Sequence, residues 1–192
     1  MSRTMSSVSF HEAGHAVVAG FVLGDSEHDF FSIDDVSIIP DAEENRLGVV
    51  LSKDYMPFDL GSVENAVTLW HKRRIIFYLS GFSAEGIAFY KGYLKHCGCT
   101  FEDLEIGSSC DENEAFALAD KIQSRQWTSH RIMKKMMEYA TEAVDELWPY
   151  VLELAQILED HKSITGEEFI EFCSPFMGGA SRNSKWRRRL YP

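Results

Sequence analysis

A pattern of two histidines and a glutamate near the amino terminus carries the clearest chemistry in this sequence. His11-Glu12-Ala13-Gly14-His15 has the H-E-x-x-H spacing and opens an apolar run. Residues four apart lie on one face of a helix, so the rings of His11 and His15 can bind a single metal ion with the Glu12 carboxylate beside it. This spacing is typical of zinc peptidases, in which the glutamate accepts a proton from the attacking water.

Glu12 also has a purely structural interpretation. Ser9 and Glu12 have the spacing of a capping box, so Glu12 could instead close the start of a helix. The helix is predicted to follow a lead-in at residues 1–8 and to end at about residue 23. Both histidines continue its apolar stripe, so we expect them to face inward.

Asp111 is the third candidate ligand. It stands in the first turn of a helix for which Ser109 and Glu112 predict a capping box. A carboxylate at the head of an apolar stripe is costly to bury without a partner. The helix amino terminus would stabilise it slightly, whereas a metal ion would do so far more and would complete a three-ligand site with an open position. The stripe continues at helical spacing through Ala115, Leu118, Ala119 and Ile122.

The remaining pattern predicts a mainly α fold of the α+β class, with one small β-hairpin or sheet. We expect a loop at 25–35 and irregular chain at 53–62 and 91–107. The methionine-rich face of the helix after residue 129 is expected to pack in the core. Pro149 should kink that helix or start a new one. Strands are expected at 36–39 and 47–52, and helices at 63–81, 84–90, 109–122, 129–161 and 165–170.

The second predicted strand offers a place for a polypeptide. A small sheet has exposed edges, and an exposed edge can accept an extended peptide as an added strand. Gly48, Val49 and Val50 are therefore candidate substrate-binding residues. The alternative is a hairpin that only supports the fold.

Composition limits the classes of function. The chain has 192 residues, 45% of them apolar, and a net charge of −11, which favours one globular domain at 1–174 and argues against general nucleic-acid binding. No secretory signal or membrane span is evident, and the four cysteines form no disulfide pattern, so we expect a cytoplasmic protein. A tail at 175–192 could touch an acidic surface or be a solvated end; its bases are Arg182, Lys185, Arg187, Arg188 and Arg189.

Taken together, five segments resemble the peptidase domain of FtsH-type ATP-dependent zinc proteases, over roughly residues 8–172. The resemblance begins with the H-E-x-x-H helix and the strand pair. It is most selective at Gly107-Ser108-Ser109-Cys110-Asp111, which resembles the segment of the third zinc ligand. The fourth segment is Leu79-Ser80-Gly81-Phe82-Ser83-Ala84-Glu85, similar to a Gly-Gly-x-x-Ala-Glu segment. The fifth is Leu158-Glu159 with Ile164-Thr165-Gly166-Glu167-Glu168, similar to the carboxy-terminal end of that domain.

The resemblance implies one zinc ion per chain, held by His11, His15 and Asp111. It also implies that the Glu85 carboxylate lies near the site and orients a histidine ligand without binding the metal itself. The resemblance is also compatible with assembly of this protein into a homo-oligomer. The departures are Ser80 and Phe82, which replace a glycine and, commonly, an arginine. A longer excursion carries His96, Cys97 and Cys99, which could bind a second metal but lack an evident fourth ligand.

The predicted function is a zinc endopeptidase that cleaves extended or unfolded polypeptides. No Gly-x-x-x-x-Gly-Lys-Ser/Thr segment occurs in the chain, so unfolding of folded substrates would need a separate ATPase partner. The rival is a non-catalytic adaptor or regulatory protein that reuses a peptidase fold, with a structural metal or none.

Overall fold

The computed structural model describes residues 5–20, 31–43, 47–54, 63–95, 98 and 100–174. Over these residues the chain is mainly helical with a small antiparallel sheet, which confirms the predicted fold class. The elements in chain order are α1 (Ser7–Val18), β1 (Phe31–Ser37), β2 (Val49–Asp54), α2 (Val63–Tyr90), α3 (Phe101–Gly107), α4 (Ser109–Ile122), α5 (Ser129–Glu146), α6 (Trp148–His161), β3 (Ser163–Thr165) and α7 (Gly166–Cys173).

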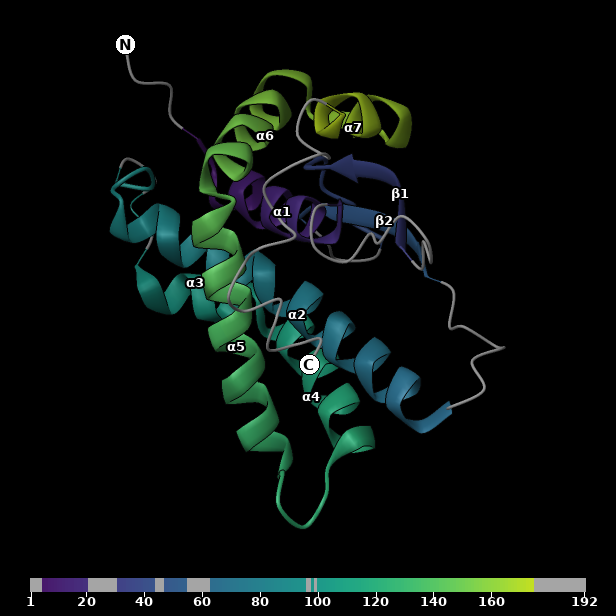
Figure 1. The fold of residues 1–192 in the computed structure, drawn as a ribbon. Coiled ribbons are helices and arrows are strands. Elements are labelled where there is room, and N and C mark those ends of the chain that lie inside the picture. Colours follow the sequence, from purple (N-terminus) through teal and green to yellow (C-terminus); the bar gives the residue numbers. More distant parts are fainter. Residues whose placement is uncertain are drawn as a thin grey trace.

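Helix α1 lies in the middle of the molecule, between the sheet and the long helix α2 (Figure 1). It begins one turn earlier than Ser9: the hydroxyl of Ser6 caps it by accepting a hydrogen bond from the Ser9 amide. Phe10 is fully buried and stacks on Trp148 of α6 with 5.7 Å between ring centroids. Burial of such a side chain contributes about 1.5–3 kcal/mol, so α1 is anchored on the side away from the histidine rings.

The backbones of α1 and α2 cross in close contact at Gly14. A Cβ atom at this position would lie 2.6 Å from both the Cβ of Ala84 and the carbonyl oxygen of Ser80. Only glycine permits this approach without a shift of one helix. The crossing brings the stretch of α2 around Gly81 directly under the histidine pair.

Helix α2 is a single helix over Val63–Tyr90, whereas the sequence predicted two pieces with a break near Gly81. The prediction of a break was wrong because contacts with α1, α4 and α5 hold the middle of α2 together. Continuity matters for the site, because Phe77, Gly81 and Glu85 then follow one another at helical spacing along one rod.

The sheet has the order β2-β1-β3, with antiparallel pairing throughout. Val36 pairs with Val50 and Ser37 with Val49, so the predicted hairpin is confirmed. Two expectations were wrong: residues 31–35, expected in a loop, belong to β1, and β3 was not predicted. Three residues are too short to give a periodic pattern, and β3 forms only because β1 offers it a partner.

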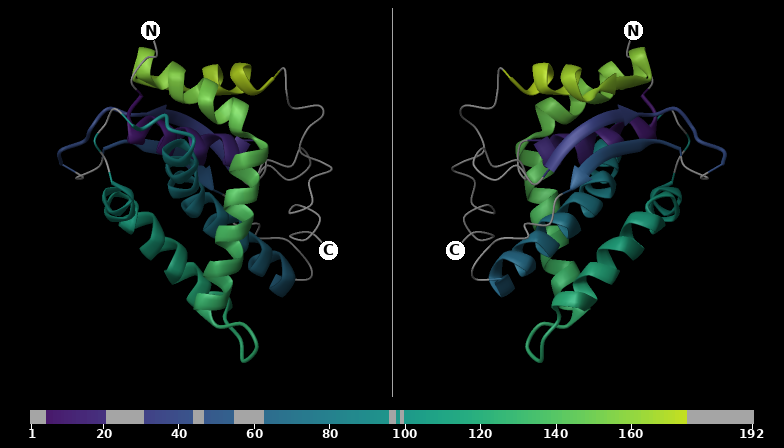
Figure 2. Two further views of the ribbon diagram at one scale, coloured as in Figure 1. Left: turned by 90° about the vertical axis from the view of Figure 1, so that its left-hand side faces the viewer. Right: turned by 90° about the vertical axis from the view of Figure 1, so that its right-hand side faces the viewer.

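The second half of the chain follows the sequence closely, with two corrections. Part of the stretch expected to be irregular forms α3, and α4 is preceded by Ser108 as N-cap rather than by Ser109. Pro149 stands at the start of α6, and Thr165 caps α7 in a full capping box with Glu168, both as predicted. In Figure 2, α4 and α5 diverge from their connection at the lower end, and α1 and the sheet lie at the upper end.

Several expectations fall outside the described residues. They are the end of the first helix beyond Gly20, the tail at 175–192, and the group His96, Cys97 and Cys99. The predicted domain boundary at residue 174 coincides with the end of the described chain and stays a prediction.

Candidate metal centre

Helix α1 places the two imidazole rings side by side. The Nε2 atoms of His11 and His15 lie 2.9 Å apart, and both side chains are nearly buried. Ser6 rather than Ser9 caps the helix, so Glu12 lies in its second turn and does not serve as a capping residue. The alternative interpretation of the H-E-x-x-H pattern as a helix start is therefore wrong.

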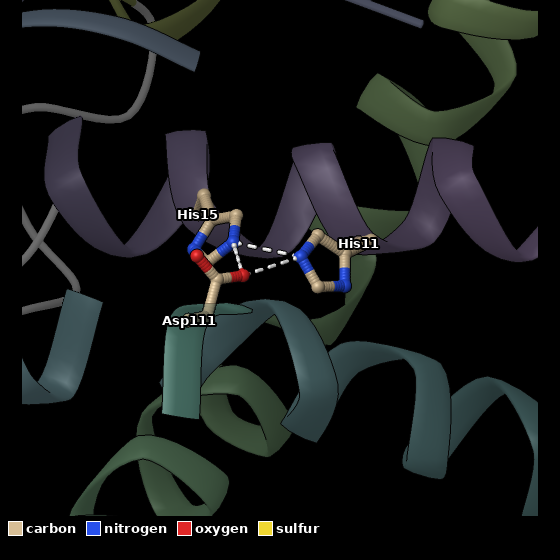
Figure 3. Close-up of side chains that lie close together, drawn as sticks. All are labelled: His11, His15 and Asp111. Atoms are coloured by element: carbon tan, nitrogen blue, oxygen red, sulfur yellow. Dashed lines mark hydrogen bonds and ion pairs between the residues drawn. The ribbon is translucent and has the colours of Figure 1, made fainter. Parts of the chain in front are cut away.

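Helix α4 brings Asp111 to the two rings. Its Oδ2 atom lies 2.8 Å from Nε2 of His11 and 3.1 Å from Nε2 of His15 (Figure 3). The apolar stripe below it packs inward as predicted, with Ala115, Leu118 and Ala119 buried. His11, His15 and Asp111 together form a group that could hold a metal ion.

The Nδ1 atom of each imidazole ring lies within hydrogen-bonding distance of an acceptor oxygen. Nδ1 of His15 lies 2.7 Å from the carbonyl oxygen of Phe77, and Nδ1 of His11 lies 3.0 Å from Oε2 of Glu85. A carbonyl oxygen only accepts, so Nδ1 of His15 must donate. With both Nδ1 atoms donating, each neutral ring carries its lone pair on Nε2 and directs it toward Asp111.

This donor set fits a metal ion. Two imidazole lone pairs and a carboxylate oxygen converge within 3.1 Å, and without a cation or a proton between them they would repel one another. Two nitrogens and one oxygen are ligands that zinc accepts, and three protein ligands leave a coordination position open. The partners at Phe77 and Glu85 supply the orientation of the rings that metal sites normally have.

The carboxylate and the histidines of the site shift the pKa values of one another. Burial by itself would raise the pKa of Asp111, but the two histidines outweigh burial and hold this pKa well below its usual range. Burial lowers the pKa of His11, yet hydrogen bonds with Asp111 and Glu85 raise it well above the ordinary value. A proton between His11 and Asp111 would relieve the same repulsion that a metal ion in that position would relieve.

Gly81 closes the site from below. A Cβ atom at this position would lie 2.5 Å from Nε2 of His15 and 2.7 Å from Nε2 of His11. Any larger residue would press on the two ligand nitrogens themselves. From the sequence, Gly81 was expected only as a helix end and as part of the resembling segment. No pattern pointed to Phe77, which contributes a backbone carbonyl.

Glu12 lies next to the group but faces the sheet. The side chain is only 6% exposed, and burial raises its pKa. A Cβ atom on Gly48 would come within 2.7 Å of Oε1 of Glu12, so the chain passes close to this carboxylate immediately before β2 begins. A raised pKa makes a carboxylate a stronger proton acceptor.

Strand β2 is an edge of the sheet over the described residues, because its only partner there is β1. Gly48, Val49 and Val50 are half-buried, and the side chain of Leu51 is exposed. Of the three residues predicted to bind a substrate, Gly48 lies beside Glu12, and no described strand pairs with the outer edge of Val49 and Val50.

The two departures from the resembling family have local explanations. The Ser80 hydroxyl donates to the carbonyl oxygen of Phe77 at 2.6 Å, the same oxygen that Nδ1 of His15 meets. Phe82 packs edge-on against Phe101 of α3, with 5.7 Å between centroids. Neither substitution enters the space between the three candidate ligands.

No protein-family model matches this chain, and no curated protein matches it either. Among the described residues, no helix combines the length and the apolar character needed to cross a membrane.

Proposed function

We propose that the protein is a zinc-dependent endopeptidase, as the resemblance to FtsH-type peptidase domains implies. The observation that supports this most directly is the convergence of His11, His15 and Asp111, with the buried carboxylate of Glu12 beside them. A structural zinc site normally has four protein ligands, whereas three ligands and a neighbouring carboxylate are the composition of a hydrolytic site.

In this proposal each residue near the site has one task. Zinc, when bound, supplies a Lewis acid that polarises the scissile carbonyl and allows water to lose a proton near pH 7. Glu12 accepts that proton and delivers it to the leaving amine. Glu85 and the Phe77 carbonyl hold the rings of His11 and His15 in the orientation that keeps Nε2 available.

The substrate class follows from the sheet edge. An extended polypeptide can pair with β2 through backbone hydrogen bonds, which depend little on side-chain identity. Gly48, immediately before β2, lies next to Glu12, so a chain paired with β2 would run near the carboxylate. Unfolded segments are therefore the proposed substrates, and folded proteins would need a separate ATPase partner to unfold them.

The experiment is casein digestion by the zinc-loaded protein, with and without a chelator, beside a Glu12→Gln variant. We expect one zinc per chain, cleavage that stops on chelation and returns with zinc, and a loss of about 100-fold or more in the variant while its zinc stays bound. Undiminished proteolysis in Glu12→Gln would remove the mechanism. Zinc at one per chain without chelator-sensitive cleavage would instead favour the adaptor.

A further inference from the structure

A pocket distinct from the metal centre lies between α2, α4 and α5, beside the connection of α4 and α5. It encloses about 270 Å³. Its apolar lining includes Ile122, Ile132 and Met136, and Trp127 forms part of the wall. In both views of Figure 2 this connection is at the opposite end of the molecule from α1. Lys72, which also lines it, stands nine residues before Gly81, or about 14 Å along α2.

Two lysines line this apolar pocket. Lys72 on α2 is half-buried, and no carboxylate of the described residues forms an ion pair with it. Lys135 on α5 pairs with Glu138 at 2.6 Å and lies 4.9 Å from the ring centroid of Tyr139. A cation on an apolar wall is costly unless an anion joins it, so the lining calls for a ligand with one negative charge.

The segment that forms one wall of the pocket is basic. From residue 121 to residue 137 the sequence contains no aspartate or glutamate, in a chain whose net charge is −11. The positive potential of such a stretch raises the local concentration of anions. Its bases are Lys121, Arg125, Arg131, Lys134 and Lys135.

The wall of the pocket is held in place before any ligand arrives. The Ser124 amide donates to the carbonyl oxygen of Trp127 at 2.8 Å, and the Trp127 amide donates back to the Ser124 hydroxyl at 3.2 Å. The guanidinium of Arg131 stacks over the Trp127 ring at 5.1 Å. A preformed wall lowers the entropic cost of binding.

We propose that this pocket binds an apolar carboxylate, with the charged end beside Lys72 and Lys135 and the apolar body against Ile122, Ile132 and Met136. A bare inorganic anion fits less well, because the apolar lining would remove its water without replacing it. The carboxy-terminal residue of a polypeptide and a small apolar acid share this chemistry. The proposal does not depend on the metal centre or on catalysis.

Titration calorimetry on the full chain tests this proposal with two probes: a short peptide that ends in a free carboxy-terminal leucine, and 3-phenylpropionate. The binding of each acid is compared with that of the corresponding amide. We expect at least one acid to bind, its amide to bind about tenfold or more weakly, and chelation to change neither result. The tighter acid tells which of the two sources the pocket accepts.

Variants locate the binding. Lys72→Gln should weaken the acid about tenfold, Lys72→Arg should restore most of the loss, and Lys134→Gln should change nothing, because Lys134 is exposed on α5 and does not line the pocket. The proposal is overturned if neither acid binds, if acid and amide bind alike, or if Lys134→Gln costs as much as Lys72→Gln. Binding lost on chelation would place the acid at the metal centre instead and would also overturn it.

Discussion

The Nε2 atom of His15 lies 2.9 Å from the Nε2 atom of His11, closer than two lone pairs can approach without something positive between them. Both rings use Nδ1 for other contacts, so neither can turn its proton toward the other without losing a hydrogen bond. The pair is thus arranged to share a cation, and the predictions begin there.

Asp111→Asn should lower zinc affinity, because the amide keeps the shape of the side chain but loses the charge that faces the ion. The loss should exceed the roughly 10–100-fold that is typical when a residue hydrogen-bonded to a metal ligand is changed. Zinc content after dialysis and a competition titration measure the effect. Glu112→Gln is the control, since it removes an exposed carboxylate from the same helical turn. Unchanged zinc affinity in Asp111→Asn would exclude it as a ligand.

Gly81→Ala should displace the ligand nitrogens and reduce zinc binding, because the new methyl group would lie 2.5–2.7 Å from them. Gly86→Ala lies on the same helix, where the nearest atom is 3.9 Å away. It should leave zinc binding intact and stabilise the protein by up to about 1 kcal/mol through helix propensity. Titration with zinc and thermal unfolding of both variants distinguish a local effect from loss of the fold. Equal zinc affinity in the two variants would contradict the role given to Gly81.

Glu85→Gln should weaken zinc binding about 10–100-fold while the fold is kept, because a neutral amide holds the His11 ring less firmly than a carboxylate. The same titration measures this. Ser83→Ala serves as a control for altered packing on α2, since Ser83 faces Met137 and Thr141 of α5. A loss in Ser83→Ala as large as in Glu85→Gln would mean that packing, and not the carboxylate, is responsible.

Gly48→Ala should leave zinc bound but lower cleavage about 100-fold, because its methyl group would push against the Glu12 carboxylate, and displacements of about 1 Å near a reacting group have such effects. Zinc content and casein digestion are measured together. Val50→Ala is the matched change on the same edge strand, and it should retain most activity. Full activity in Gly48→Ala would argue against Glu12 as the base.

Acid should weaken the anchor between α1 and α6. Burial raises the pKa of Glu159, but hydrogen bonds from the Ser6 amide and hydroxyl outweigh burial and hold it below its ordinary value of 4.5. A lowered folded-state pKa stabilises the protein above the unfolded-state pKa, and this stability is lost as the pH falls through the folded-state value.

Glu159→Gln should therefore lower the free energy of unfolding by about 1 kcal/mol at pH 7, and the difference from the wild type should shrink below pH 4.5. Urea unfolding at pH 7 and at decreasing acidic pH measures it. A difference that stays constant or grows in acid would contradict the assigned hydrogen bonds.

Much of the site could be predicted from local patterns. The spacing of His11 and His15 within one helix, and the place of Asp111 at the head of an apolar stripe, depend only on residues a few positions apart. Pro149 and Thr165 marked helix starts correctly for the same reason. The break expected in α2 and the loop expected at residues 31–35 were wrong, because packing against other elements decides both.

The sequence by itself determined which side chains could supply two nitrogens and a carboxylate, and that each would sit on the inward face of its own helix. Only the tertiary structure decided that the two helices meet. The close crossing at Gly14 and the space left by Gly81 set the distance between α1 and α2, and α4 packs against α2 with Asp111 toward the rings. Helical periodicity specifies the direction of a side chain about its own axis, whereas the distance between side chains on different helices depends on how their backbones pack.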